Sequence, residues 1–245
     1  MNGLDLFTGI GGLSIALRGY VKPIIYCEID PYCQKVLLSR MSDKYLCNCP
    51  IWDDIRTFSG LPFKGIIDII YAGFPCQDIS IAKNGKGLEG ERSGLFFEIL
   101  RLAKEIKPKF IFLENVPAIT TRGGIQVVKE ITELGYDCRW CIISAASIGA
   151  KHLRKRWFLL AYTKSERCKE GGFSLRTEKG QPRFNNYIEH EIWNEEPKDK
   201  FELVGMVNGI SNRMDRIKAL GNSVVPLQAR KAFEILMGIN KNFTE

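Results

Sequence analysis

The stretch "LDLFTGIGG", residues 4–12, joins an apolar run to a glycine-rich turn and then to an amphipathic segment. Residues 4–7 predict a buried strand, and residues 11–20 have the apolar spacing of a helix. Glycines at such a turn let the backbone approach a ligand and leave the first amide groups of the helix open. The stretch therefore predicts a strand–helix unit whose turn holds a ligand.

The same alternation continues to about residue 162. Strands are predicted at residues 24–28, 67–73, 110–114, 141–144 and 158–162, and helices at residues 30–41, 94–106 and 124–136. Strands that are apolar on both faces and alternate with helices are typical of a mostly parallel sheet covered on both sides. We therefore expect a doubly wound, Rossmann-like α/β fold that binds ligands at the carboxyl ends of its strands.

The pattern changes after residue 162. Residues 163–207 are polar, turn-rich and weakly periodic, and they are longer than an ordinary connection. Residues 208–245 then read as a loop that leads into a long amphipathic helix. We therefore divide the chain into residues 1–162, a small segment at 163–207, and a part at 208–245 that packs back on the first.

The bulk composition is that of an ordinary globular protein, with 45% hydrophobic and 26% charged residues among 245. No apolar run reaches the length of a membrane span, and no signal peptide is predicted, so we expect a cytoplasmic protein. The net charge is +7, and basic residues gather in 151–157 and 212–220. These clusters fit either a surface that faces phosphates or a solvated basic face.

Eight cysteines raise the question of zinc. Cys138 and Cys141 form a C-x-x-C, and Cys47 and Cys49 form a C-x-C, but only two histidines are present. The C-x-x-C also runs straight into an apolar strand, which is unlike a zinc knuckle. We therefore predict no metal, and mostly inert thiols in a reducing compartment.

Features of an adenosine pocket follow the first two predicted strands and recur in the third βα region. Gly9 and Gly11 match part of a dinucleotide fingerprint, but Ser14 stands where its third glycine belongs. Glu28 ends the second strand, where a carboxylate can hold ribose hydroxyls. Residues 53–55, "DDI", suit an adenine amino group and an apolar wall. The set favours S-adenosylmethionine over NAD.

Two reactive groups follow the next two strands. Cys76 lies behind a proline in "GFPCQDIS", residues 73–80, and Glu114 ends the strand in "FIFLENVP". A thiol must be activated to act as a nucleophile, and a glutamic acid must have a raised pKa to act as a general acid. Alternatively, Cys76 is inert and Glu114 caps a turn through Asn115.

In their order along the chain, these motifs resemble those of the DNA (cytosine-5)-methyltransferase family, as in a short single-chain bacterial or phage-like member. The resemblance rests on "DLFTGIGG", "CEID", "WDDI", "GFPCQDIS", "ENV", "HLRKR" at 152–156 and "LGNSVVP" at 220–226. The "HLRKR" stretch resembles the family's Gln-x-Arg-x-Arg motif, with His152 in place of the usual glutamine and with Arg154 and Arg156 in their usual places. The resemblance makes residues 1–162 the catalytic and cofactor-binding domain and residues 163–207 a small target-recognition segment.

The resemblance implies a reaction and its residues. The Cys76 thiolate adds to carbon 6 of a cytosine flipped out of duplex DNA, and carbon 5 takes the methyl group of S-adenosylmethionine, leaving S-adenosylhomocysteine. The implied catalytic residues are Cys76, Glu114, Arg154, Arg156 and Pro75. The implied cofactor-binding residues are Phe7, Thr8, Gly9, Gly11, Gly12, Glu28, Ile29, Asp54, Ile55, Gly73, Leu95, Asn222 and Val224. The candidate DNA-binding residues are Ser80, Lys83, Arg92, Arg154, Arg156 and Arg213.

The expected partner is double-stranded DNA, and a cognate restriction endonuclease is a candidate second partner. We expect a monomer associated with the nucleoid. A tRNA cytosine-5 methyltransferase is the first alternative, although its Cys-Phe-Thr signature is absent. A non-catalytic nucleic-acid-binding relative and a thiol redox protein are further alternatives, but the first would usually lack Cys76 or Glu114, and the second needs a neighbouring thiol.

Overall fold

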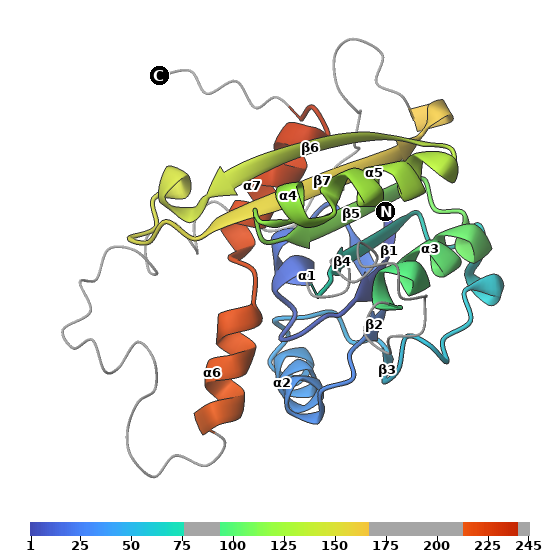
Figure 1. Cartoon of the computed structure of the whole chain (residues 1–245). Coiled ribbons are helices and arrows are strands. Elements are labelled where there is room, and N and C mark those ends of the chain that lie inside the picture. The colour runs from blue at the N-terminus through green and yellow to red at the C-terminus, as the bar shows by residue number, and fades with distance from the viewer. Residues whose placement is uncertain (76–93, 167–212, 240–245) are drawn as a thin grey trace.

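The computed structural model describes residues 1–75, 94–166 and 213–239 (Figure 1). Within these ranges, seven strands form one sheet in the order β3-β2-β1-β4-β5-β7-β6. The parallel part consists of β1 (Asn2–Leu6), β2 (Lys22–Cys27), β3 (Ile51–Trp52), β4 (Ile69–Gly73) and β5 (Phe110–Asn115). The expected mostly parallel sheet is confirmed.

Two antiparallel strands complete the sheet. β6 (Tyr136–Ser144) forms its edge, and β7 (Lys155–Thr163) turns back between β5 and β6, antiparallel to both. Because β7 enters next to β5, the hairpin between β6 and β7 carries Arg154 and Arg156 toward the end of β5 where Glu114 lies. A motif far along the chain thus reaches the edge of the sheet where Glu114 lies.

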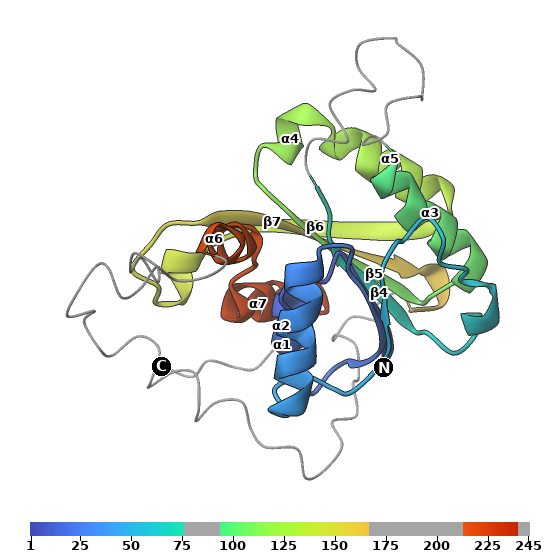
Figure 2. The same cartoon turned by 90° about the horizontal axis from the view of Figure 1, so that it is seen from below.

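Helices cover both faces of the sheet. Figure 2 shows α3, α4 and α5 on one side and α1, α2 and α7 on the other. Their bounds are α1 Gly12–Ala16, α2 Pro31–Ser42, α3 Leu95–Ile106, α4 Ile119–Arg122, α5 Gly124–Glu133, α6 Arg213–Asn222 and α7 Pro226–Leu236. None of these described helices is long and apolar enough to cross a membrane.

Each helical layer buries its own part of the core. On one face, Phe96 and Ile99 of α3 pack with Val127 of α5 against the strands. On the other face, Leu13 of α1 packs with Phe233 of α7. Two separate apolar layers on one sheet define the predicted doubly wound architecture, which is confirmed.

The structure differs from the sequence patterns at three places. β3 was not among the predicted strands, because its two residues are too few for any periodic pattern. Residues 213–222 form helix α6 where a loop was expected, because Ala219 packs against Ile10 and Cys33, contacts that the local pattern does not contain. Helix α1 ends at Ala16 rather than near residue 20, and the turn that follows it includes Gly19 in the left-handed conformation at φ 89°.

The C-x-x-C motif lies in the middle of β6. Side chains three residues apart on a strand point to opposite faces. Cys138 accordingly packs with the α3 side of the core, and Cys141 packs with the α7 side. One metal ion therefore cannot bind both thiols in this conformation.

Candidate active site

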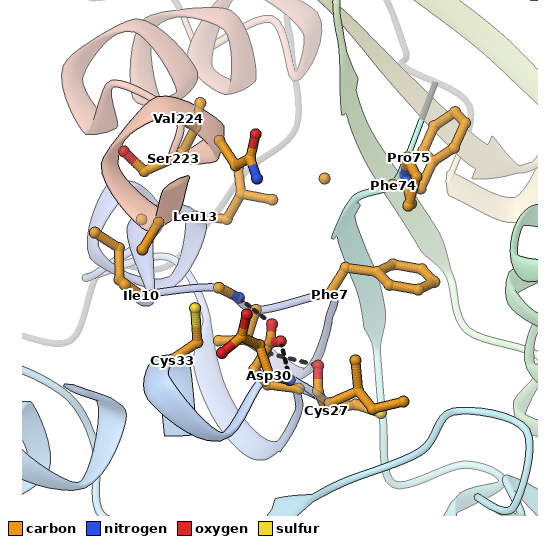
Figure 3. Close-up of a pocket in the computed structure, with 18 of the residues that line it drawn as sticks. Phe7, Ile10, Leu13, Cys27, Asp30, Cys33, Phe74, Pro75, Ser223 and Val224 are labelled. Carbon is orange, nitrogen blue, oxygen red and sulfur yellow. Dashed lines mark hydrogen bonds between the residues drawn. The ribbon is translucent and has the colours of Figure 1, made fainter. Parts of the chain in front are cut away.

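A cavity of about 910 Å³ opens at the carboxyl ends of β1, β2, β4 and β5. In Figure 3, Ser223 and Val224 face it from the turn between α6 and α7, while Phe74 and Pro75 approach from the end of β4. Asp30 enters from the start of α2. Elements from the first and last parts of the chain thus enclose one site, at the edge of the sheet where this fold binds ligands.

The glycine-rich turn after β1 brings backbone close to the C-terminal motif. Gly11 caps α1 with φ at 86°, a conformation that disfavours any side chain. A Cβ atom placed on Gly12 would lie 2.9 Å from Cγ1 of Val224. The glycines therefore allow the first and last motifs to meet at the cavity wall.

A buried polar network lies beneath this turn and explains Ser14. The Ser14 hydroxyl donates to Oδ2 of Asp5 at 2.6 Å and lies 2.7 Å from the Tyr71 hydroxyl. Asp5 is fully buried, and burial raises its pKa to about 8. A glycine at position 14 would leave both Asp5 and Tyr71 short of a partner, so the departure from the dinucleotide fingerprint has a structural reason.

Glu28 ends β2 with its carboxylate at the cavity. Its Oε2 accepts from the Gly9 amide at 2.6 Å, and its Oε1 accepts from the Asp30 amide at 2.8 Å. Burial raises the pKa of this carboxyl, while the two amide donors oppose that shift. Each carboxylate oxygen has a second lone pair, so the group can still accept hydroxyl donors from a ligand.

Asp54 and Ile55 form the wall beyond β3. Asp54 is partly buried and accepts from the Arg56 guanidinium, whose Nη2 lies 2.7 Å from Oδ2 and whose Nε lies 3.0 Å from each carboxylate oxygen. Those hydrogen bonds hold the pKa of Asp54 below its ordinary value. Ile55 is buried beside it. A fixed carboxylate next to an apolar side chain suits a flat base with an amino group.

Glu114 and Arg156 form an ion pair at the other end of the cavity. Nε of Arg156 lies 2.8 Å from Oε1 of Glu114, and both side chains are mostly buried. Two effects compete on the carboxyl: burial raises its pKa, and the positive charges of Arg156 and Arg154 lower it. Burial outweighs them and raises the pKa of Glu114 to about 7. Glu114 can therefore exchange a proton near neutral pH.

Gly73 and Asn115 fix the chain that leads to Cys76. A Cβ atom on Gly73 would lie 3.1 Å from Oε2 of Glu114, so glycine gives this carboxyl its room. The Asn115 side chain donates to the Phe74 carbonyl at 3.0 Å and accepts from the Val116 amide at 2.8 Å. The "ENV" motif thus anchors the residue before Pro75 to the end of β5.

Arg154 does not line the cavity but holds the "LGNSVVP" motif, residues 220–226, in place. Its Nη2 donates to the carbonyl of Gly221 at 2.8 Å and to that of Ser223 at 2.6 Å. Gln228 of α7 in turn donates to the Arg154 carbonyl at 2.7 Å. These contacts fix the turn that presents Ser223 and Val224 to the cavity.

An ion pair joins two rims of the cavity. Nζ of Lys218 on α6 lies 3.0 Å from Oδ2 of Asp30, which also caps α2 by accepting from the Tyr32 amide. This pair connects the "CEID" motif to helix α6, which leads into the "LGNSVVP" motif.

The structure gathers most of the predicted residues around one cavity. Every predicted cofactor residue except Gly11 lines it, and so do Pro75, Glu114 and Arg156. Gly11 faces Leu37 and Leu46 instead, and Arg154 lies behind the wall. Cys76, Ser80, Lys83 and Arg92 lie outside the described residues, and Arg213 begins α6 with its side chain undescribed.

Sequence reasoning missed further lining residues. The additional side chains are those of Ile10, Leu13, Cys27, Asp30, Cys33, Arg56, Phe74, Asn115, Val116, Lys218, Ala219 and Ser223. Most of them lie in or next to a quoted motif, so their position in the sequence could have identified them as lining residues. Cys33 and Lys218 had none, because only the packing of α6 on α2 brings them to the cavity.

Comparison with known proteins assigns the chain to a family. The family model described as C-5 cytosine-specific DNA methylase matches residues 1–208. The chain belongs to the C-5 cytosine-specific DNA methylase family. The resemblance seen in the motifs is thereby confirmed.

Two relatives show the extent of the similarity. Type II methyltransferase M.CviJI of Paramecium bursaria Chlorella virus IL3A is 36% identical over 231 residues, which are 94% of this chain and 58% of that protein. Type II methyltransferase M.HhaI of Haemophilus parahaemolyticus is 34% identical over 165 residues, 65% of this chain and 48% of that protein. The chain thus spans about half the length of the curated relatives that it matches.

Solved structures agree on the fold. The Entamoeba histolytica methyltransferase EhMeth matches with a TM-score of 0.65 and 16% identity, covering 98% of each chain. The S. pombe Dnmt2 methyltransferase matches with a TM-score of 0.57 and 22% identity, covering 75% of this chain and 57% of the other. At these identities the likeness concerns the fold alone.

Proposed function

We propose that the chain transfers a methyl group from S-adenosylmethionine to carbon 5 of a flipped-out cytosine in duplex DNA, through a covalent adduct with Cys76. The observation that carries the proposal is the position of Glu114. Its buried carboxyl, with a pKa of about 7, faces the same cavity as Glu28, Asp54 and Pro75, the residue directly before Cys76.

The residues of the cavity suit S-adenosylmethionine. Glu28 offers carboxylate oxygens to ribose hydroxyls, and Asp54 with Ile55 offers an acceptor and an apolar wall to adenine. Because Gly12 has no side chain, Val224 packs directly against the turn after β1 and helps to form the cavity wall. The cavity volume lies near the upper end of the usual range for small-molecule sites, which allows for a cofactor and a base. When bound, the cofactor supplies an electrophilic methyl group on a positively charged sulfur.

The chain's own residues perform the remaining chemistry. The thiolate of Cys76 forms a bond to carbon 6 of cytosine, and the ring electrons move toward carbon 5 and nitrogen 3. Glu114 donates a proton or hydrogen bond to nitrogen 3, so the ring does not hold an uncompensated negative charge. Carbon 5 takes the methyl group, a base removes the proton from carbon 5, and the sulfur leaves with its electron pair.

Arg156 keeps Glu114 in place for this step. At 2.8 Å from Oε1, its guanidinium orients the carboxyl while leaving Oε2 available. Arg154 supports the cofactor side through the turn at Ser223. We therefore propose that Arg154 positions the turn at Ser223 and that Arg156 orients Glu114 next to the reacting cytosine.

DNA recognition is proposed for residues 163–207. Phosphate contacts hold a duplex without reading it, and contacts to base edges supply specificity. Arg167, Arg176, Arg183, Asn185 and Asn186 carry suitable donors and acceptors, and a segment of this length suits a site of about two to four base pairs. The monomeric state, the nucleoid association and a cognate restriction endonuclease stay predictions.

Covalent trapping tests the proposal. Duplex DNA that carries 5-fluorocytosine should form a denaturation-resistant complex with the wild type and S-adenosylmethionine, because fluorine at carbon 5 blocks release of the sulfur. Cys76→Ser should form none, yet bind the cofactor as before. Cys47→Ser, which changes an exposed thiol away from the cavity, is the matched control.

The outcomes are distinct. Full methyl transfer by Cys76→Ser would contradict the covalent mechanism. Trapping on tRNA but not on duplex DNA would assign the chain to the tRNA cytosine-5 alternative. Binding of DNA and cofactor without methyl transfer by the wild type would leave the non-catalytic alternative.

A further inference from the structure

A charged cluster on α3 lies outside the cavity but beside one of its walls. Arg101 forms ion pairs with Glu98, Nε to Oε2 at 2.7 Å, and with Glu105, Nη1 to Oε1 at 2.8 Å. The spacings of three and four residues place all three side chains on one face of the helix. That face lies against the chain that follows β3.

The cluster is hydrogen-bonded to the backbone of this chain at three points. Nη2 of Arg101 donates to the carbonyls of Ile55 and Phe58, each at 2.9 Å. Oε2 of Glu105 accepts from the Gly60 amide at 2.6 Å. A Cβ atom on Gly60 would lie 2.7 Å from the Ile106 side chain, so the two elements are in close contact. We name residues 53–60 the adenine-side loop, because it carries Asp54 and Ile55.

Arginine is the side chain suited to this arrangement. Its planar guanidinium has five donors, which here serve two carboxylates and two carbonyls at once. A lysine in the same place would have a compact ammonium group and could not span these four acceptors. Two glutamates hold the guanidinium in a single orientation, so the positions of both carbonyls are defined.

Contacts within the loop do not provide this connection. Arg56 pairs with Asp54, but both residues belong to the adenine-side loop and move with it. Phe58 is buried and stacks on Phe63, with ring centroids 5.5 Å apart. The side chains of Ile55 and Phe58 are also buried in the core that contains the α3 side chains, whereas the Arg101 bond fixes the Ile55 carbonyl next to Asp54.

We infer that Arg101, with Glu98 and Glu105, is a positioning residue that sets the adenine specificity of the cofactor site. By fixing the Ile55 carbonyl, it places the Asp54 carboxylate and the Ile55 side chain relative to β2 and α3. Helix α3 also begins at Leu95, which lines the cavity. The helix therefore connects Leu95 and the adenine-side loop as one unit. The inference rests on the proposed function, in which Asp54 accepts from the adenine amino group.

The preference of the site for an adenine ligand over a hypoxanthine ligand tests the role of Arg101. The dissociation constants of S-adenosylhomocysteine and S-inosylhomocysteine, which has a carbonyl in place of the adenine amino group, are measured by calorimetry. Arg101→Met should raise the dissociation constant of S-adenosylhomocysteine about tenfold, at the low end of what charge-assisted hydrogen bonds contribute. It should raise the dissociation constant of S-inosylhomocysteine by a smaller factor, so that the preference for adenine decreases. Turnover at saturating cofactor should stay within about twofold.

Two further variants make the test decisive. Lys104→Met removes an exposed cation from the same helix and should change neither constant. Arg101→Lys keeps the charge but loses the bridge, so it should show the same loss of preference, and it replaces Arg101→Met if that variant does not fold. Equal weakening of both ligands, or unchanged binding of both, would overturn the inference. If the wild type binds neither ligand, the proposed function itself fails and the inference falls with it.

Discussion

Replacing Glu114 by glutamine should change how protein stability depends on pH. The carboxyl is about nine-tenths buried, and its pKa is raised from the ordinary 4.5 to about 7. Between these two values the folded protein keeps a proton that the unfolded chain releases. The stabilisation from this group is therefore fully present below about pH 4.5 and is lost as the pH rises through about 7.

The size of the effect follows from the pKa difference. At about 1.4 kcal/mol per pH unit, the loss amounts to about 3 kcal/mol, of which about 2 kcal/mol falls between pH 5.5 and 8.5. Glutamine does not titrate, so the free energy of unfolding of Glu114→Gln should rise relative to the wild type by that amount over this interval. The same variant should lose turnover about 10²–10⁴-fold, as expected for a general acid.

Urea unfolding followed by tryptophan fluorescence at several pH values between 5.5 and 8.5 measures the difference. Glu105→Gln is the matched control, because hydrogen bonds from Arg101 and Gly60 lower the pKa of Glu105 and leave it ionised throughout. Its difference from the wild type should be constant over the interval. A constant difference for Glu114→Gln as well would refute the raised pKa and, with it, the role of Glu114 as a proton donor near neutral pH.

Two further predictions concern the cofactor and the recognition segment. Glu28→Ala should weaken S-adenosylmethionine binding by about 1–3 kcal/mol, since it removes a charged acceptor and leaves the Gly9 and Asp30 amides unpaired; equal affinity by calorimetry would place the ribose contact elsewhere. Exchanging residues 163–207 for the corresponding segment of a related enzyme should change which cytosines are methylated and leave cofactor affinity unchanged. An active exchanged protein that still methylates the original sites would show that specificity lies outside the segment.

Local sequence patterns predicted what depends on neighbours along the chain. The apolar runs predicted every strand except β3, and the motifs at the strand ends predicted about half of the residues that line the cavity. In a parallel sheet, the carboxyl ends of successive strands meet at one edge, so motifs that follow strands converge without further information. That is why Glu28 and Glu114, far apart in sequence, could be assigned to one site.

Contacts between distant segments could not be predicted. The bonds from Arg154 to the Gly221 and Ser223 carbonyls join residues 67 and 69 positions apart, and those from Arg101 to Ile55 and Phe58 span 46 and 43. No periodicity in the sequence records such pairs. Arginines in both places read equally well as solvated surface charges, and only the packing of the elements shows which backbone carbonyls they reach.

Nucleoside analysis of modified DNA tests the central claim most directly. Duplex DNA is incubated with the purified chain and isotope-labelled S-adenosylmethionine, digested to nucleosides and examined by mass spectrometry, with Cys76→Ser in parallel. We predict label only in 5-methyldeoxycytidine, and none with Cys76→Ser. Label on an exocyclic amino group of cytosine or adenine, or equal labelling of carbon 5 by both proteins, would contradict methyl transfer through a Cys76 adduct.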